Sequence, residues 1–293
     1  MENFSLYING VLRTVCVPPQ WTLLRVLRET LGLTGAKNGC SSGDCGACRV
    51  ILDGTAVNAC KVPIKDAAGH RVETIEGLSR NGQLHPIQQA FIDCGAVQCG
   101  FCTPGMVMAA KALLDKESDP SEDEIRRALR GNICRCTGYV KIVDAVRLAA
   151  RLLRDGKIPE SDESWAVGSR VPRLDVREKV LGYGEYTDDM YIDGMAYASA
   201  LRAEYPRARI LKIDTEKAKA ADGIIAVFTA KDIPGQNKVG HLKKDWDTMI
   251  AVGDVTHYLG DAICLVAAET PEILAEAKAR VRVDYEVLPA VHD

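Results

Sequence analysis

The sequence predicts a multidomain α+β protein of three units, because the spacing of its apolar residues changes twice along the chain. Residues 1–80 alternate apolar and polar side chains in short runs, which is typical of β-strands. Residues 81–156 switch to helical spacing, and residues 177–293 mix short strands with a few helices. A chain of 293 residues is long enough for two or three domains.

The first unit is expected to adopt a β-grasp fold. Two alternating runs joined by Asn9-Gly10 predict a hairpin, because Asn-Gly favours the tight turn between antiparallel strands. A second hairpin is expected at Asp53-Gly54 for the same reason. Between the hairpins, apolar residues at helical spacing predict a helix that ends at Gly32. Strand pairs wrapped around one helix, with a closing strand at the end of the unit, indicate the β-grasp arrangement.

The second unit is expected to be a four-helix bundle. The helices are predicted over 85–96, 103–116, 124–132 and 141–155. Thr103 is the expected N-cap of the second helix, with Pro104 at its first position. Ser121 and Glu124 form a capping-box pattern before the third helix.

The third unit, residues 177–293, is expected to be α+β. Residues 157–176, which precede it, are polar and irregular and therefore predict a linker. Thr270 followed by Pro271 predicts the start of a helix. Strands are expected over 195–203, 209–214, 224–230, 261–269 and 281–289.

Eight of the eleven cysteines fall into two tight sets, whose spacing indicates metal binding. The first set reads C-x4-C-x2-C-x11-C and comprises Cys40, Cys45, Cys48 and Cys60. The second set comprises Cys99, Cys102, Cys134 and Cys136. The first spacing is that of plant-type [2Fe–2S] sites, and four thiolates in the second set predict a second cluster. Structural zinc, which also takes four cysteines and favours C-x2-C pairs, is the alternative, chiefly for the second set.

Two features are expected to stabilise the negative charge of such clusters. Glycines beside the first cysteines let the backbone pass close to a cluster and direct N–H groups toward it. These glycines are Gly39, Gly43 and Gly46. Pro104 opens a helix just after Cys102, so the positive end of that helix is expected to face the second cluster. Arg130 and Arg135 flank the other cysteine pair of this set.

Composition excludes several classes of protein. A net charge of −3 and the lack of a Lys/Arg run argue against a nucleic-acid partner. The N-terminus has no export signal, and no run of about 18 apolar residues predicts a membrane span. A cytoplasmic location is therefore expected, because reduced thiols persist there. The remaining cysteines, Cys16, Cys94 and Cys264, lie in apolar runs and are expected to be small buried hydrophobes.

Taken together, the motifs resemble those of the xanthine oxidase family of molybdenum hydroxylases. The stretches GCSSGDCGACRV, QCGFCTPGM and GNICRCTGY are similar to the three cluster signatures of that family. The stretch RLDVREKVLGYGEYTDDM looks like the start of its hammerhead domain. The resemblance covers essentially the whole chain. It implies a ferredoxin-like [2Fe–2S] domain, a helical [2Fe–2S] domain and an α+β hammerhead domain.

The resemblance also implies roles for individual residues. The first cysteine set would ligate an outer [2Fe–2S] cluster, and the second set an inner one. Gln98 and Cys136 match positions that lie against the molybdopterin cofactor in the family, so both are expected to bind that cofactor. An exposed loop amide is the alternative for Gln98. Electrons would then pass from molybdenum through the pterin, the inner cluster and the outer cluster to an external acceptor.

Two departures from the family pattern change the expected function. Residues 157–176 take the place of a flavin domain and are too few to form one, so no FAD is expected in this chain. A flavin subunit or a separate acceptor protein would receive the electrons, as in flavin-free aldehyde oxidoreductases. The sequence ends at Asp293, where the large molybdenum-binding domains should begin, and it has no Gly-Gly pair of the molybdopterin loop.

The expected function is therefore the electron-transfer portion of a molybdenum hydroxylase, with no catalytic residue of its own. A molybdenum-binding subunit, or further C-terminal domains, would supply the active site. The missing flavin insertion favours aldehyde oxidation, with hydroxylation of purines or other N-heterocycles as the alternative. A free-standing two-cluster electron carrier and the remnant of a truncated gene are the other interpretations. The hammerhead region argues against the pure carrier, which has no use for it.

Overall fold

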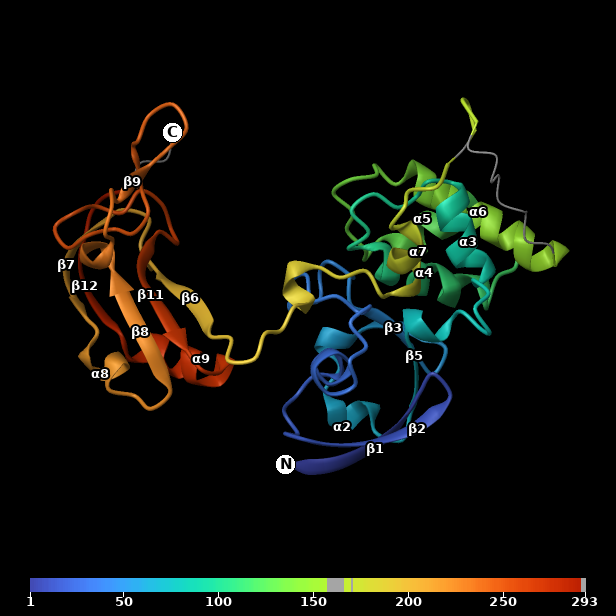
Figure 1. The fold of residues 1–293 in the computed structure, drawn as a ribbon, viewed down its shortest axis with the longest axis horizontal. Helices are drawn as coiled ribbons and strands as arrows, with labels where there is room; N and C mark the ends of the chain where they lie inside the picture. Colours follow the sequence, from blue (N-terminus) through green and yellow to red (C-terminus); the bar gives the residue numbers. More distant parts are fainter. Residues whose placement is uncertain (157–165, 170, 291–293) are drawn as a thin grey trace. The chain divides into compact units, whose positions relative to one another are not determined.

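The structure, a computed structural model, describes residues 1–156, 166–169 and 171–290. The described chain forms two compact units, Met1–Met190 and Tyr191–Asp293 (Figure 1). Each unit has hydrophobic clusters of its own. The mixture of sheets and helices agrees with the predicted α+β class.

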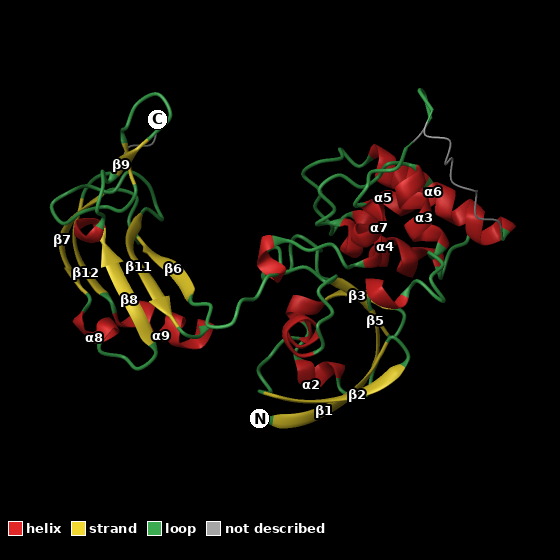
Figure 2. Ribbon diagram, viewed as in Figure 1, coloured by secondary structure: helices red, strands yellow, loops and turns green. Residues whose placement is uncertain are grey.

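A five-stranded sheet, in the order β2-β1-β5-β3-β4, forms one side of the first unit (Figure 2). Its strands are β1 (Glu2–Ile8), β2 (Val11–Val17), β3 (Arg49–Leu52), β4 (Thr55–Asn58) and β5 (Arg71–Glu73). Asn9 and Gly10 have φ angles of 51° and 83°, and Asp53 and Gly54 have φ angles of 45° and 77°. This left-handed backbone is what two-residue hairpin turns require. Both predicted hairpins are therefore confirmed.

One helical segment packs on this sheet. It begins as α1 (Leu23–Arg25) and widens into a π-helical turn, η1 (Val26–Thr30). Leu23 and Leu27 are buried among sheet residues such as Leu6, so sheet and helix share one core. The shorter elements of this domain are η2 (Ala59–Lys61), α2 (Ile64–Ala67) and η3 (Ile75–Gly77). A sheet wrapped on one helix matches the β-grasp prediction.

Four helices form the bundle that follows. They are α3 (Pro86–Asp93), α4 (Thr103–Leu114), α5 (Glu122–Leu129) and α6 (Val140–Asp155). Helix α4 is buried along most of its length, because its residues are apolar on every side. The Ser121–Glu124 capping box is confirmed, with both of its reciprocal hydrogen bonds present.

The predicted cap of α4 is wrong by one residue, since Cys102 and not Thr103 is its N-cap. Cys102 already has dihedral angles close to helical values, with φ of −80° and ψ of −15°. The preceding turn is closed by a hydrogen bond from the Thr103 N–H to the Gly100 carbonyl, at 3.1 Å. That turn leads directly into the helix, so Thr103 is drawn into its first position.

The three cysteines outside the two sets differ in exposure. Cys264 is buried, as expected, whereas Cys94 is only partly buried. Cys16 is exposed, contrary to the prediction. It lies on β2 between Val15 and Val17, which face the core. Since neighbouring residues of a strand point to opposite faces, Cys16 points away from the core.

The chain rejoins the first unit before the end of the predicted linker (157–176), of which residues 157–165 and 170 lie outside the described residues. We call residues 173–189 the strap. The strap contains α7 (Val176–Leu181) and η4 (Thr187–Asp189). Val176 and Val180 are buried in the core of the bundle. The structure thus packs residues 177–190 with the first unit, whereas the sequence pattern grouped them with the third.

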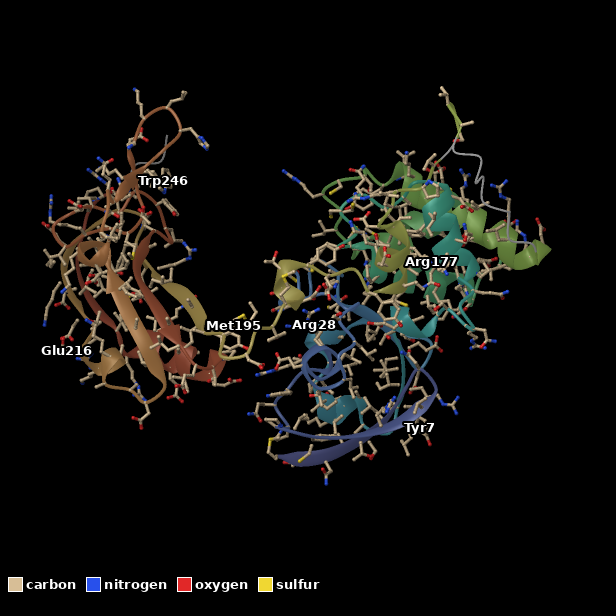
Figure 3. The ribbon with its side chains drawn as sticks, viewed as in Figure 1. Tyr7, Arg28, Arg177, Met195, Glu216 and Trp246 are labelled. Carbon is tan, nitrogen blue, oxygen red and sulfur yellow. The ribbon has the colours of Figure 1, made fainter. Side chains whose placement is uncertain are left out.

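Buried charges attach the end of the strap to the β-grasp domain. One of them is Arg28, which is labelled in Figure 3. The Lys37 side chain is only 2% exposed, and its Nζ donates to Asp189 Oδ2 at 2.6 Å and to the Gly184 carbonyl at 3.0 Å. Arg28 donates to Asp189 Oδ1 at 2.7 Å. Burial opposes ionisation of Asp189, but the hydrogen bonds from Lys37 and Arg28 outweigh it and lower the pKa of this carboxyl group.

The described part of the second unit contains one three-stranded sheet and two two-stranded sheets, the smaller of which pairs two residues from each strand. The three-stranded sheet comprises β6 (Tyr197–Arg202), β11 (Ala262–Ala268) and β8 (Ile224–Thr229), and the larger two-stranded sheet comprises β12 (Arg282–Val287) and β7 (Ala208–Asp214). The remaining elements are α8 (Glu216–Lys219), η5 (Ala230–Asp232), β9 (Lys238–Val239), β10 (Trp246–Asp247) and α9 (Pro271–Arg280). All five strands and the helix predicted here are confirmed. Thr270 caps α9 by accepting a hydrogen bond from the Ile273 N–H.

Helix α9 packs against the three-stranded sheet (Figure 1). Its residues Leu274 and Ala277 are buried together with Val227 and Val266 of the sheet. Among the described helices, none combines the length and the apolar character needed to cross a bilayer.

Replacing Asp189 by alanine should destabilise the first unit by roughly 3–5 kcal/mol, the range found when one partner of a buried ion pair is removed. The Lys37 and Arg28 charges would lose the carboxylate that they share. Denaturant unfolding gives the free energy. Asp188→Ala is the matched control, because the Asp188 side chain is 63% exposed. Equal decreases in the free energy of unfolding of the two variants would contradict a special role for the buried carboxylate.

His85 should make stability depend on pH. Its Nδ1 caps α3 by accepting from the Ile87 N–H, and burial, followed by the nearby Lys111 charge, lowers the pKa of His85 to about 4. The unfolded chain binds this proton near its ordinary pKa of about 6.5. Stability is therefore complete above that pH and falls as the pH drops toward about 4.

His85→Asn keeps a capping acceptor but removes the titrating group. The difference between the melting temperatures at about pH 7.5 and about pH 5.5 should be smaller in the variant than in the parent protein. A difference of the same size in both proteins would show that His85 is not the group responsible.

Candidate iron–sulfur sites

The first cysteine set lies in the β-grasp domain. Three of its members are in the loop between η1 and β3, and Cys60 is in η2. Cys40 is exposed and Cys45 is partly buried, whereas Cys48 and Cys60 are buried. The fold thus brings Cys60 to the other three from beyond the second hairpin.

The four thiols of this set meet in two contacting pairs. The side chain of Cys40 contacts that of Cys45, and the side chain of Cys48 contacts that of Cys60. Hydrogen bonds from Ser42 and from the Cys45 N–H lower the pKa of Cys40 to about 6. Burial raises the pKa of Cys48 to about 12. The exposed end of the set therefore ionises readily, while the buried end needs the charge of a bound metal to become a thiolate.

Glycines make room for this loop, as predicted. A Cβ atom on Gly39 would lie 2.9 Å from the Cys45 sulfur. Gly46 has φ of +67°, and a Cβ atom there would lie 2.1 Å from the Gly131 carbonyl oxygen. A side chain at either position would push the cysteine loop away from its neighbours.

The second set is in the helical bundle. Cys99 and Cys102 precede α4, while Cys134 and Cys136 lie between α5 and α6. Here too the thiols form two contacting pairs, because Cys102 contacts Cys134 and Cys136 contacts Cys99. Cys99 and Cys136 are exposed, whereas Cys102 is buried. This set therefore also has an exposed end and a buried end.

The surroundings of the second set shift the pKa values of its thiols in opposite directions. Burial raises the pKa of Cys102. Burial also opposes ionisation of Cys134, but hydrogen bonds, including one from Thr137 Oγ1 at 3.1 Å, outweigh it and lower the pKa of Cys134. Cys102 is at the amino end of α4, as the sequence predicted. The positive end of that helix dipole thus lies beside the pair.

Three side chains that the sequence did not single out hold the loops of this set. The hydroxyl of Tyr139 accepts from the Cys134 N–H at 2.9 Å. The Tyr186 hydroxyl of the strap donates to the Cys99 carbonyl at 2.8 Å, and Arg173 of the strap donates to the Gln98 carbonyl at 2.6 Å. Tyr139 belongs to the GNICRCTGY motif, and Arg173 and Tyr186 belong to RLDVREKVLGYGEYTDDM, but neither motif indicated that these side chains contact the cysteine loops.

Gln98 is exposed next to Cys99, and Cys99 contacts Cys136. The fold therefore brings the two residues predicted to bind the pterin to the same exposed end of the second set. Phe101 packs edge-on against Tyr186, with ring centroids 5.3 Å apart, and Lys37 lies 4.7 Å from the centre of the Tyr186 ring.

The two cysteine sets meet at a backbone contact that we call the junction, formed by residues 45–46 and 132–133. The N–H of Ile133 donates to the Cys45 carbonyl at 2.9 Å. The side chain of Asn132 donates to the Gly46 carbonyl, also at 2.9 Å. Cys45 belongs to the first set, and Ile133 directly precedes Cys134 of the second. One hydrogen bond therefore connects the backbones that carry the two sets.

This donor set fits [2Fe–2S] clusters. Such a cluster takes four thiolates, two on each iron, and each set presents four thiols in two contacting pairs. The described His, Cys, Asp and Glu side chains include no group of three or more arranged to hold a single metal ion.

Three domain families match successive parts of the chain. The 2Fe-2S iron-sulfur cluster binding domain matches residues 6–76, and the [2Fe-2S] binding domain matches residues 74–147. The a/b hammerhead domain of aldehyde oxidase and xanthine dehydrogenase matches residues 181–289. The chain thus contains two domains that bind [2Fe–2S] clusters and one hammerhead domain.

Known proteins resemble the chain over different lengths. An aldehyde oxidoreductase of Megalodesulfovibrio gigas is 39% identical over 97% of this chain and 33% of its own length. The small FeS subunit of nicotinate dehydrogenase from Eubacterium barkeri is 50% identical over 50% of this chain and 94% of its own length. The solved aldehyde oxidoreductase of Desulfovibrio gigas superimposes with a TM-score of 0.87 and 37% identity, over 99% of this chain and 34% of that one.

The chain therefore spans about a third of the aldehyde oxidoreductases that it matches and nearly all of a dedicated iron–sulfur subunit. Its motifs, domains and fold agree with one another: the chain belongs to the xanthine oxidase family of molybdenum hydroxylases.

Proposed function

We propose that this chain carries electrons from a molybdopterin site to an external acceptor within a molybdenum hydroxylase. The observation that supports this most strongly is the junction. Two four-thiol sets lie in one compact unit, and a hydrogen bond from Ile133 to Cys45 connects the backbones that carry them. Two redox centres held in series serve to conduct electrons.

In this proposal, Cys40, Cys45, Cys48 and Cys60 ligate the outer cluster. Cys99, Cys102, Cys134 and Cys136 ligate the inner cluster. When bound, a [2Fe–2S] cluster takes up and gives back one electron at a time, and the protein supplies its position and potential. The paired contacts within each set and the close-packed glycines of the first set support this assignment.

The exposure of the thiols indicates where electrons would enter and leave the pair of clusters. The inner set is exposed at Cys99 and Cys136, and the outer set is exposed at Cys40. Between these ends lie the buried thiols of Cys48, Cys60 and Cys102. Electrons would enter at Cys136 and leave near Cys40, where an acceptor protein or a flavin subunit can approach.

Gln98 and Cys136 would form the contact with the pterin. Gln98 offers an exposed amide, and its backbone is fixed because Arg173 binds its carbonyl. Arg173 is itself held by Asp175, with Nε 2.5 Å from Oδ1. The molybdenum cofactor itself would be bound by another subunit or by further domains. The hammerhead domain supports this view, because it is part of the molybdenum-binding portion in this family.

Aldehyde oxidation is the reaction that we propose for the complete enzyme. The aldehyde oxidoreductases match the chain through the hammerhead domain as well as both cluster domains. Hydroxylation of an N-heterocycle is the second candidate, because the iron–sulfur half has higher identity to a nicotinate dehydrogenase subunit. The many reduced thiols make the cytoplasm the proposed location.

Anaerobic purification followed by iron and sulfide analysis tests the proposal. About four irons per chain and two S = 1/2 EPR signals after dithionite reduction are expected for two [2Fe–2S] clusters. Zinc without sulfide, or a single signal, would contradict it. Molybdenum in the purified material would identify a partner complex, whereas a free-standing carrier or a gene remnant would be isolated with clusters but no molybdenum.

Cys136→Ser should impair the inner cluster and leave the outer one assembled, because the two sets lie on separate domains. Cys40→Ser is the matched variant, since Cys40 is the exposed thiol of the other set. Each variant should change a different EPR signal. Loss of both signals in either variant would mean that the two sets do not hold independent clusters.

A further inference from the structure

Tyr186 of the strap contacts three successive residues of the loop that begins the second cysteine set. Its hydroxyl donates to the Cys99 carbonyl at 2.8 Å. A Cβ atom on Gly100 would lie 2.8 Å from the same hydroxyl oxygen, so the side chain packs directly on the backbone of the loop. The Tyr186 ring also packs edge-on against Phe101, with centroids 5.3 Å apart. One side chain of the strap therefore fixes the backbone that carries Cys99.

Tyr186 is itself held in place from the side of the β-grasp domain. The Lys37 Nζ lies 4.7 Å from the centre of the Tyr186 ring and forms a buried ion pair with Asp189. The Tyr186 N–H donates to Asp189 Oδ2 at 3.0 Å. The ring and the backbone of this residue are thus fixed by the same ion pair. Because the hydroxyl is already in position, its hydrogen bond to the loop costs little conformational entropy.

Cys99 is a cysteine of the second set that needs such support. Cys102 is buried in the core of the bundle, which holds its side chain in place. Cys99, by contrast, is exposed and lies in no helix or strand. Groups outside a set of metal ligands commonly orient those ligands through hydrogen bonds. The Tyr186 hydroxyl is placed to do this for Cys99 through its carbonyl group.

We propose that Tyr186 is a positioning residue that fixes Cys99 as a ligand of the inner cluster. The inference rests on the proposed electron-transfer function and assigns a role to a residue that lies outside the family match of both cluster domains. Without the hydroxyl, the Cys99 backbone and its sulfur would sample several positions, and the inner cluster would be lost sooner from its exposed end. Tyr186 approaches the outer set through Lys37, which precedes Cys40 by three residues. The effect on the outer cluster is therefore smaller.

The test compares Tyr186→Phe with the parent chain, each isolated with its clusters. The variant keeps the ring that packs on Phe101, and Arg173 still holds the neighbouring Gln98, so the loop should stay folded. Removal of the inner cluster by the iron chelator bathophenanthroline disulfonate should become about tenfold faster, which is the lower end of the affinity loss found when a partner of a metal ligand is removed. The inner EPR signal should also broaden, because Cys99 no longer has a single position. The outer signal, which is the one that survives in Cys136→Ser, should keep its width and its rate of loss.

Tyr183→Phe is the matched control, because it removes a hydroxyl from the same strap at a residue that is 60% exposed, and it should leave both signals unchanged. A Tyr186→Phe protein that holds the outer cluster but not the inner one also supports the inference. An unchanged inner signal with an unchanged rate of loss would overturn it. Equally faster loss of both clusters would overturn it too, because Tyr186 would then stabilise the unit as a whole. If the parent chain lacks two signals, the proposed function fails and the inference fails with it, which is a distinct result from two signals that Tyr186→Phe does not change.

Discussion

The close approach of the backbone at Gly46 is the constraint on which both cysteine sites depend. The Gly46 carbonyl oxygen lies where a Cβ atom on Gly105 would come within 2.2 Å, so α4 can only pack there because residue 105 has no side chain. Residue 46 must itself lack a side chain, because a Cβ atom there would lie 2.1 Å from the Gly131 carbonyl oxygen. This contact allows the Cys45 carbonyl to reach the N–H of Ile133. A methyl group at either glycine would separate the two domains at the point where their cysteine loops meet.

The strap also connects the two cluster domains, because it contacts both of them. Its end is attached to the β-grasp domain through the buried Asp189, which binds Lys37, and Lys37 precedes Cys40 by three residues. Its Tyr186 binds the carbonyl of Cys99, which begins the other set. A segment that follows both cluster domains in the sequence thus fixes the loop beside each set. Loops held in this way are prearranged for their ligands, which lowers the entropic cost of binding a cluster.

Burial and charge divide each set into a reactive end and a protected end. The Cys40 thiol is exposed and its pKa is lowered to about 6, while burial raises the pKa of Cys48 to about 12. Cys136 is exposed and Cys102 is buried in the second set. The protected ends need a compensating positive charge. In the second set, the fold supplies such a group at the α4 helix end beside Cys102.

The sequence by itself determined the features that depend on neighbouring residues. Asn9-Gly10 sets its hairpin through local turn geometry, and Ser121 and Glu124 set a helix start. Cysteine spacing indicated the chemistry of the first set, and the family motifs added that of the second. Only the tertiary structure decided which groups from distant parts of the chain meet. It brought Arg173 to Gln98 and turned Cys16 outward. The reason is physical: a local pattern reports the preferences of a few adjacent residues, whereas burial and long-range contacts depend on how the whole core packs.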